Sequence, residues 1–224
     1  MVPAVFRERP NRFLGVVDVG GEEILCFIPN PGRMEELLYP GSKVYLMEMP
    51  SEDRKTRYDL ILVNLKGTLV SIDSRVPNKL VAEAIQLSNF SEFQGLRIEK
   101  KEPLFGGSRL DFLLTGDSDQ LFLEVKSCTL VRDGTGLFPD APTTRGSRHL
   151  KTLASGLTIG RSVILFVIQR PDAKNLRPND ATDPKFGKNL RLVKDLGVEI
   201  CAYNSDVTLE GVSLKRKVPV LLDP

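Results

Sequence analysis

The sequence predicts two consecutive domains, an all-β domain in residues 1–77 and an α/β domain with a mixed sheet in residues 78–224. Three observations support this prediction. Short aliphatic and β-branched segments, separated by Gly and Pro, fill the first third of the chain. A helical pattern begins after Pro77. Beyond it, helical and strand patterns alternate, which is typical of α/β domains.

Five segments in the first third have the composition of β-strands and end at turn signals such as Gly-Gly and Pro-Gly. They are RFLGVVDV (12–19), EEILCFI (22–28), SKVYLMEM (42–49), YDLILVNL (58–65) and TLVSID (68–73). One helical insert, MEELL (34–38), is expected after Pro31 and Gly32. Short strands with one helix predict a small β-barrel of oligonucleotide-binding type.

The second domain is expected to begin with a helix capped by Asn78, whose apolar face leaves Glu83 near its margin. A hairpin follows in RLDFLLTGDSDQLFLEVKSCTL (109–130). The remaining expected elements are a helix at 144–157, a strand at 162–169, a helix around 185–196 and a strand at 198–203.

Composition excludes several classes of protein. No apolar run reaches the length of a membrane span, and arginines occupy the N-terminal segment where a secretory signal would be apolar, so we expect a cytoplasmic protein without a membrane partner. The three cysteines lie far apart and there is one histidine, which argues against a disulfide framework and an imidazole zinc site. The net charge of +2 is too small to indicate nucleic-acid binding, so the placement of charge must decide.

Charged residues interrupt the apolar hairpin. If Leu114 faces Leu121, alternation places Asp111 directly across from Glu124, about 5 Å away, and puts Lys126 on the same face. Two such carboxylates repel unless a cation lies between them, and Mg²⁺ or Mn²⁺ prefers oxygen ligands of this kind. Lys126 would then orient a water or stabilise phosphate charge.

The alternative is a solvated hairpin face on which Lys126 neutralises both carboxylates. A register shifted by one residue would also place the two carboxylates on opposite faces of the sheet.

The pattern of Asp111 followed by Glu124-Val125-Lys126 is similar to the core of the restriction-endonuclease-like nuclease superfamily. The resemblance implies that Asp111, Glu124 and Glu83 bind metal and that Lys126 serves catalysis. It also implies that Gln169, at the end of a neighbouring strand, joins the site, with strand-end capping as the alternative. Leu110 stands where the superfamily often has proline.

A narrower resemblance covers nearly the whole chain. Several segments, in the same order, look like the sugar fermentation stimulation protein A family: IPNPGRM (28–34), VPNKLVAEAI (76–85), RLDFLL (109–114), LEVKSCTL (123–130), FPDAPTTRGSRHL (138–150) and DPKFGKNL (183–190). This resemblance implies an oligonucleotide-binding-type barrel, a nuclease-like domain, DNA binding and a role in regulating sugar metabolism. It implies no settled catalytic activity.

Four basic residues are candidate contacts for nucleic acid. Arg33 follows Gly32 at the expected start of MEELL, where a helix N-terminus favours phosphate; pairing with Glu35 or Glu36 is the alternative. Arg145, Arg148 and Lys151 form a stripe on the helix after Thr143 or Thr144, facing solvent or phosphate. His149 beside them is more often structural than catalytic in such a position.

The leading hypothesis is therefore a DNA-binding protein with a Mg²⁺- or Mn²⁺-dependent phosphodiesterase site. The alternative is a non-catalytic DNA-binding regulator on a nuclease-like scaffold. A sugar-metabolism enzyme acting on small molecules is disfavoured because the chain has neither a phosphate-binding loop nor a nucleophile elbow. The sequence leaves open whether the site cleaves and whether the chain forms a homodimer.

Overall fold

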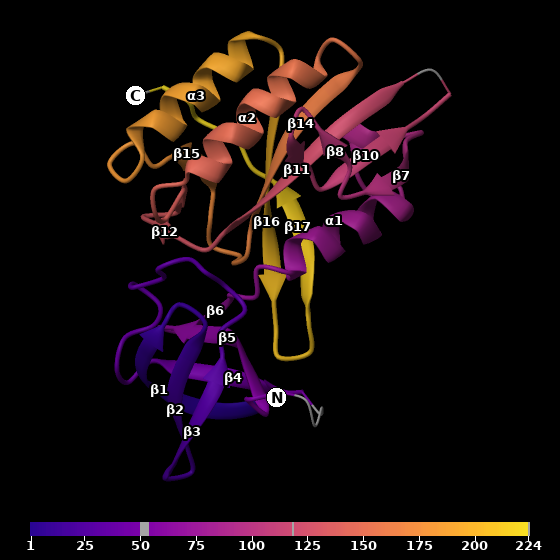
Figure 1. Ribbon diagram of the computed structural model, residues 1–224. Coiled ribbons are helices and arrows are strands. Elements are labelled where there is room, and N and C mark those ends of the chain that lie inside the picture. The colour runs from indigo at the N-terminus through magenta and orange to yellow at the C-terminus, as the bar shows by residue number, and fades with distance from the viewer. Residues whose placement is uncertain (50–53, 118, 224) are drawn as a thin grey trace.

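The computed structural model describes residues 1–49, 54–117 and 119–223. The first third forms a β-barrel, and the rest forms a mixed sheet flanked by helices, which lies above the barrel in Figure 1. This is the fold class that the sequence predicts. Within these ranges, no helix is long and apolar enough to cross a membrane.

The barrel is closed by pairing between strands that are distant in sequence. Its strands are β1 (Val2–Asn11), β2 (Leu14–Val19), β3 (Glu22–Phe27), β4 (Lys43–Glu48), β5 (Tyr58–Leu65) and β6 (Thr68–Ser71). β1 pairs with β2 and β4, β2 with β3, and β4 with β5, all antiparallel. A short parallel contact joins β3 to β5, so these strands close a ring around a core that includes Phe6, Ile28 and Leu60.

Two features of the barrel differ from expectation. β1 was not predicted, because Pro3 and Pro10 make its sequence a poor strand. The MEELL helix was predicted wrongly: Met34 has a φ of 51°, and the backbone N–H groups of Leu37 and Leu38 both donate to its carbonyl in a single turn. These three side chains are buried in the barrel core, so packing fixes the segment as a turn.

The second part of the chain contributes the remaining elements. Its helices are α1 (Val76–Gln86), the short η1 (Ser91–Phe93), α2 (Thr144–Gly156) and α3 (Pro184–Asp195). Its strands are β7 (Arg97–Lys101), β8 (Leu104–Phe105), β9 (Ser108–Arg109), β10 (Phe112–Thr115), β11 (Gln120–Cys128), β12 (Val131–Arg132), β13 (Thr135–Phe138), β14 (Arg161–Ile168), β15 (Asn175–Pro178), β16 (Glu199–Val207) and β17 (Val212–Lys217).

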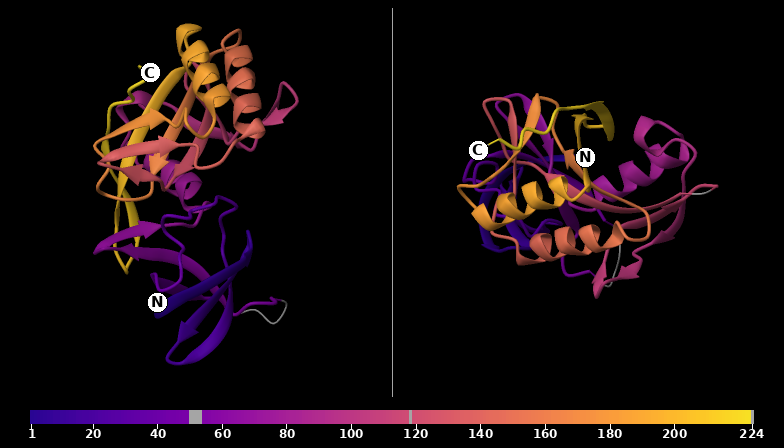
Figure 2. Two further views of the ribbon diagram at one scale, coloured as in Figure 1. Left: turned by 90° about the vertical axis from the view of Figure 1, so that its left-hand side faces the viewer. Right: turned by 90° about the horizontal axis from the view of Figure 1, so that it is seen from above.

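The main sheet has the order β17-β16-β14-β11-β10-β7. β11, β14 and β16 run parallel, and the outer pairs are antiparallel, so the sheet is mixed as predicted. α2 and α3 lie together on one side of it, as Figure 2 shows from above. α1 packs on the opposite side, where Val81 and Ile85 meet Leu123 and Val163. The two faces of the central strands are therefore both buried.

The helix starts follow from local capping. Thr143 Oγ1 accepts a hydrogen bond from Gly146 N at 2.9 Å, which confirms the predicted N-cap of α2. α1, however, begins at Val76, not after Asn78, because Pro77 is well tolerated in a first helical turn. Asn78 consequently lies inside the first turn, and its side chain is available for another contact.

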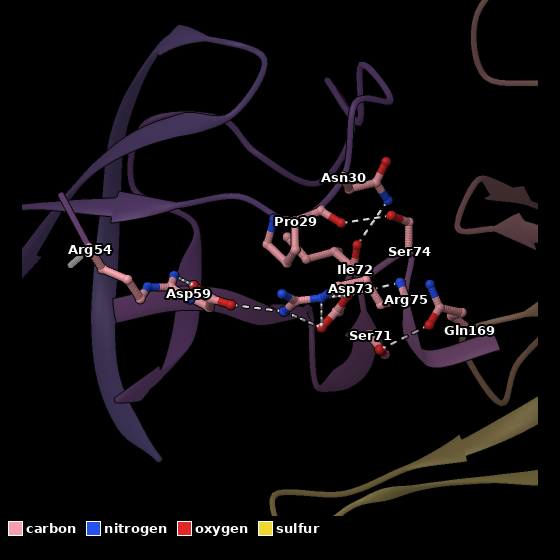
Figure 3. Close-up of polar contacts among 10 residues, drawn as sticks. All are labelled: Pro29, Asn30, Arg54, Asp59, Ser71, Ile72, Asp73, Ser74, Arg75 and Gln169. Carbon is pink, nitrogen blue, oxygen red and sulfur yellow. Dashed lines mark hydrogen bonds and ion pairs between the residues drawn. The ribbon is translucent and has the colours of Figure 1, made fainter. Parts of the chain in front are cut away.

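An ionic network joins the barrel to the start of α1 (Figure 3). The Asp59 carboxylate on β5 is fully buried and accepts hydrogen bonds from Arg54 and from Arg75 Nη2, the latter at 2.8 Å. Arg75 Nη2 also bonds Asp73 Oδ2 at 2.7 Å. Arg75 immediately precedes α1, so this network fixes where the helix leaves the barrel.

The β16–β17 hairpin reaches down to the barrel (Figure 1). Val207 from the hairpin packs with Ile61 and Leu62 of β5. This apolar contact and the Asp59 network together determine how the barrel is placed against the sheet.

Candidate functional site

The β10–β11 hairpin adopts the predicted register. Leu114 pairs with Leu121 and Phe112 with Leu123, and the side chains of all four are buried against α1. Leu110 differs from expectation, because it packs on the side of α2 and α3. The regular alternation of side chains therefore begins only at Phe112, the first residue of β10, and does not include Asp111.

Asp111 is held by two donors at the base of the hairpin. Its Oδ2 accepts a hydrogen bond from the backbone N–H of Val125 at 2.7 Å, and its Oδ1 accepts one from Asn78 Nδ2 at 2.7 Å. The first bond ties Asp111 to β11 beside Glu124, and the second ties it to the first turn of α1. Asn78 is therefore a site residue, although the sequence indicated only a helix cap.

Glu124 lies at the centre of a buried polar cluster. Its Oε1 contacts both Lys126 Nζ and His149 Nδ1, while its Oε2 is buried without a hydrogen bond to any described residue. The His149 ring is only 3% exposed, and Arg145 Nε donates to its other nitrogen at 3.4 Å. His149, which sequence reasoning ranked low, thus fixes one side of Glu124.

The pKa values of the two carboxyl groups are shifted in opposite directions. Burial, together with the negative charge of Glu124, raises the pKa of Asp111. Burial would also raise the pKa of Glu124, but the hydrogen bond from His149 and the charge of Lys126 outweigh it, so this pKa is lowered. The same burial therefore acts on both carboxylates, but only at Glu124 do the neighbouring donors and charges outweigh it.

These side chains open into a cleft of about 440 Å³ between the barrel and the α/β domain. Asp111, Glu124 and Lys126 line its floor, and Arg145 lines its rim. The opposite wall comes from the barrel segment 30–32 and from the residues between β13 and α2, including Asp140. Both parts of the chain are therefore needed to form the cleft.

One guanidinium shapes the barrel wall of the cleft. Arg9 donates to the carbonyls of Asn30 at 2.9 Å, Gly32 at 2.7 Å and Arg33 at 2.6 Å. Gly32 lies close to the opposing loop: a Cβ atom there would lie 2.6 Å from Asp140 Oδ2, so the Asp140 side chain would have to shift to admit one. The wall is thus a close contact between backbone and the opposing loop.

Five predicted site residues do not line this cleft, namely Glu83, Arg33, Gln169, Arg148 and Lys151. Glu83 is exposed on α1 and borders another depression with Tyr203 and Leu214, because it lies about 140° around the helix from Asn78. Arg33 is exposed beside the cleft wall, without the helix N-terminus expected for it.

Gln169 is fully buried behind the cleft, not on its surface. Its side chain donates to Ser127 Oγ at 3.0 Å and accepts from Ser71 Oγ at 3.1 Å, as Figure 3 shows for Ser71. It links β6 of the barrel to β11, whose Ser127 lines the cleft.

The predicted basic stripe of α2 is exposed. Arg145 borders the cleft, whereas Arg148 and Lys151 border an adjacent depression. Thr143 lines both hollows, so the stripe leads outward from the carboxylates.

Within the described residues, no three or more His, Cys, Asp or Glu side chains are placed together to hold a metal ion. The carboxylates that converge are the pair Asp111 and Glu124. A pair of carboxylates is a common protein contribution to a Mg²⁺ site, because waters and substrate phosphate supply the other oxygens.

Two family models match the chain. The SfsA N-terminal OB domain matches residues 8–72, and the sugar fermentation stimulation protein RE domain matches residues 75–211. A sugar fermentation stimulation protein homolog from Moorella thermoacetica is 47% identical over 99% of this chain and 97% of its own length. A homolog from Clostridium perfringens strain 13 is 42% identical over 98% and 96%, respectively.

A solved structure has the same architecture throughout. SfsA from Pyrococcus furiosus in complex with Ca²⁺ is similar with a TM-score of 0.92 and 32% sequence identity, covering 98% of this chain and 95% of that one. The similarity therefore includes both the barrel and the α/β domain.

Proposed function

Because the chain belongs to the sugar fermentation stimulation protein family, with an OB domain followed by a restriction-endonuclease-like domain, we propose that it binds DNA and hydrolyses phosphodiester bonds with a divalent cation. One observation carries the proposal. Asp111, Glu124 and Lys126, which come from separate positions of the hairpin, line one cleft with Arg145 at its rim.

The residues present fit a hard divalent cation. Glu124 Oε2 is a buried carboxylate oxygen that no described residue satisfies, and Asp111 lies on the same cleft floor. Mg²⁺ and Mn²⁺ accept such oxygen ligands, and a relative has been solved in complex with Ca²⁺. The cation, when bound, would polarise the phosphoryl group and acidify a bound water.

Each neighbouring side chain then has a definable task. Asn78 and the Val125 N–H orient Asp111, while His149 orients Glu124. Lys126 carries a positive charge next to Glu124, where it can stabilise charge that develops on the phosphate. Glu83 and Gln169 have no part in the proposed chemistry, because they do not line the cleft.

DNA is the proposed partner because exposed cations continue from the cleft along α2. Arg145, Arg148 and Lys151 can contact successive phosphates without reading bases. The cytoplasmic location, the homodimer and the division between residues 77 and 78 stay predictions.

One observation favours the non-catalytic alternative. Both oxygens of Asp111 and one oxygen of Glu124 already have protein donors. On this alternative the cluster is structural, and DNA binding through the basic surface is the whole function.

A paired assay separates the two proposals. Labelled single- and double-stranded DNA is incubated with the protein in EDTA, Mg²⁺ or Mn²⁺, and both retention and cleavage are followed. Metal-dependent cleavage should disappear in Asp111→Asn and persist in Asp117→Asn, a control at an exposed aspartate in the turn of the same hairpin. Retention without cleavage in the unsubstituted protein would favour the regulator, and equal cleavage by both variants would locate the activity elsewhere.

A further inference from the structure

The barrel carries a second depression of about 470 Å³ that shares no lining residue with the cleft. The β1–β2 connection, the end of β3 and the segment before β5 contribute to it. Its lining residues are Asn11, Phe13, Leu14, Phe27, Arg54, Lys55 and Thr56.

Two phenylalanines give this depression an aromatic surface. The rings of Phe13 and Phe27 are stacked, with centroids 6.1 Å apart and an interplanar angle of 15°. The Arg54 guanidinium lies 5.9 Å from the centroid of the Phe27 ring. Phe13 remains 44% exposed, so an aromatic ring is presented to solvent. Nucleobases stack on such rings whatever their sequence, because every base has a π-face.

Positive charge accompanies the rings. Lys55 lines the depression and Arg12 adjoins Phe13 in the chain; both are exposed, and within the described residues neither forms an ion pair. Arg54 is held in place by the buried Asp59 carboxylate (Figure 3). Aromatic rings with nearby cations suit a strand of bases joined by phosphates, whereas a purely apolar partner would leave these cations without a role.

The depression and the cleft are adjacent along the chain. Phe27 lines the first and Asn30 lines the second, so no more than about 10 Å of backbone separates them. The Arg9 guanidinium donates to the carbonyls of both Arg12 at 2.6 Å and Asn30 at 2.9 Å, which fixes the two loops to each other. A strand lying on the rings can therefore continue toward the carboxylates.

We propose that Phe13 and Phe27 form a stacking platform for the bases of single-stranded nucleic acid. The continuation of that strand into the cleft rests on the proposed function, but stacking on the platform does not require hydrolysis. Contact of bases with position 13, measured in EDTA, therefore tests the platform without hydrolysis, and its failure is distinguishable from a failure of the nuclease proposal.

The direct test uses Phe13→Trp. The chain contains no tryptophan, so this variant has a single indole whose fluorescence reports its contact with bases. Titration in EDTA with a single-stranded DNA oligonucleotide should quench the fluorescence to saturation, and a duplex of the same sequence should quench it much less. Tyr39→Trp is the matched control, since Tyr39 is also 44% exposed but lies outside both depressions, and it should show no quenching.

Affinity supplies the second test. Phe13→Ala should weaken binding of the single-stranded oligonucleotide about tenfold by fluorescence anisotropy, whereas Tyr39→Ala should leave it unchanged. The same titration is repeated with an RNA strand of the same sequence. A tenfold loss of affinity in Phe13→Ala for DNA, for RNA or for both supports the platform and shows which type of strand it binds. Unchanged affinity of a folded Phe13→Ala protein for both strands, or equal quenching by strand and duplex, would overturn the proposal.

Discussion

Replacing Asp59 by Asn tests whether the ionic network holds the barrel to the α/β domain. The carboxylate is fully buried, whereas the side chains of Arg54 and Arg75 keep 28% and 46% of their surface exposed. Charge-assisted hydrogen bonds contribute about 1.5–3 kcal/mol each, and the exposure of both partners argues for the lower end. Asn keeps one acceptor oxygen, so one hydrogen bond remains but loses its charge assistance. The Asn NH₂ group faces the other guanidinium, so the second hydrogen bond is lost, and the total cost is about 3 kcal/mol.

Thermal unfolding measures this loss. For a chain of this size, about 3 kcal/mol corresponds to a fall in Tm of roughly 6–12 °C. Asp206→Asn is the control, because Asp206 pairs with Lys215 at the surface and should cost less than about 1 kcal/mol. A fall in Tm for Asp59→Asn no larger than that of the control would refute the reasoning. Arg75→Ala should also cost less when combined with Asp59→Asn than alone.

Three further outcomes follow from the contacts. Although burial opposes it, the hydrogen bond from Lys217 lowers the pKa of Glu92, so this carboxylate stabilises the fold above the usual Glu pKa and loses that effect as pH falls through the lowered value. Glu92→Gln should therefore cost about 2 kcal/mol at pH 7 in urea unfolding, and a deficit that failed to shrink below about pH 4 would contradict this. Arg145→Ala should weaken DNA retention and reduce the slope of log affinity against log salt by about 1; an unchanged slope would exclude a phosphate contact. Burial raises the thiol pKa of Cys26 to about 12, of Cys128 to about 12 and of Cys201 to about 11. A disulfide reagent at pH 8 should therefore modify no thiol in the native protein and all three after unfolding. Rapid modification of the native protein would contradict the burial of these thiols.

The hairpin could be predicted because alternation determines its register. Leu114 and Leu121 must both reach the core under α1, and a shift of one residue would turn these side chains away from that core and bring Glu124 into it. The same constraint brought Asp111 beside Glu124. Prediction failed from Arg109 to Asp111: Arg109 pairs with β8, Leu110 packs on the other side of the sheet, and β10 begins only at Phe112.

The roles of Glu83 and Asn78 could not be assigned from the sequence. Asn is a favoured N-cap, yet Pro77 allows the helix to begin at Val76, and the side chain of Asn78 then bonds Asp111 instead of the helix backbone. Glu83 faces elsewhere because the orientation of α1 depends on its packing against the sheet. Local sequence signals do not contain that information.

The cleft wall also escaped prediction, since it is a tertiary contact between distant segments. Asn30 and Gly32 reach the site only because Arg9, the Asp59 network and Gln169 fix the barrel in place. The sequence singles out Gly32 and Gln169, but it does not indicate that their segments meet at one cleft. His149 likewise became interpretable only when α2 was placed against β11.

The central claim is that Asp111 and Glu124 share one divalent cation in the cleft. Isothermal titration calorimetry with Mn²⁺ tests it most directly, because the measurement does not depend on cleavage or on a nucleic acid. We predict binding by the unsubstituted protein and by Asp117→Asn, and its loss in Asp111→Asn. Equal Mn²⁺ binding by Asp111→Asn and Asp117→Asn would contradict the account.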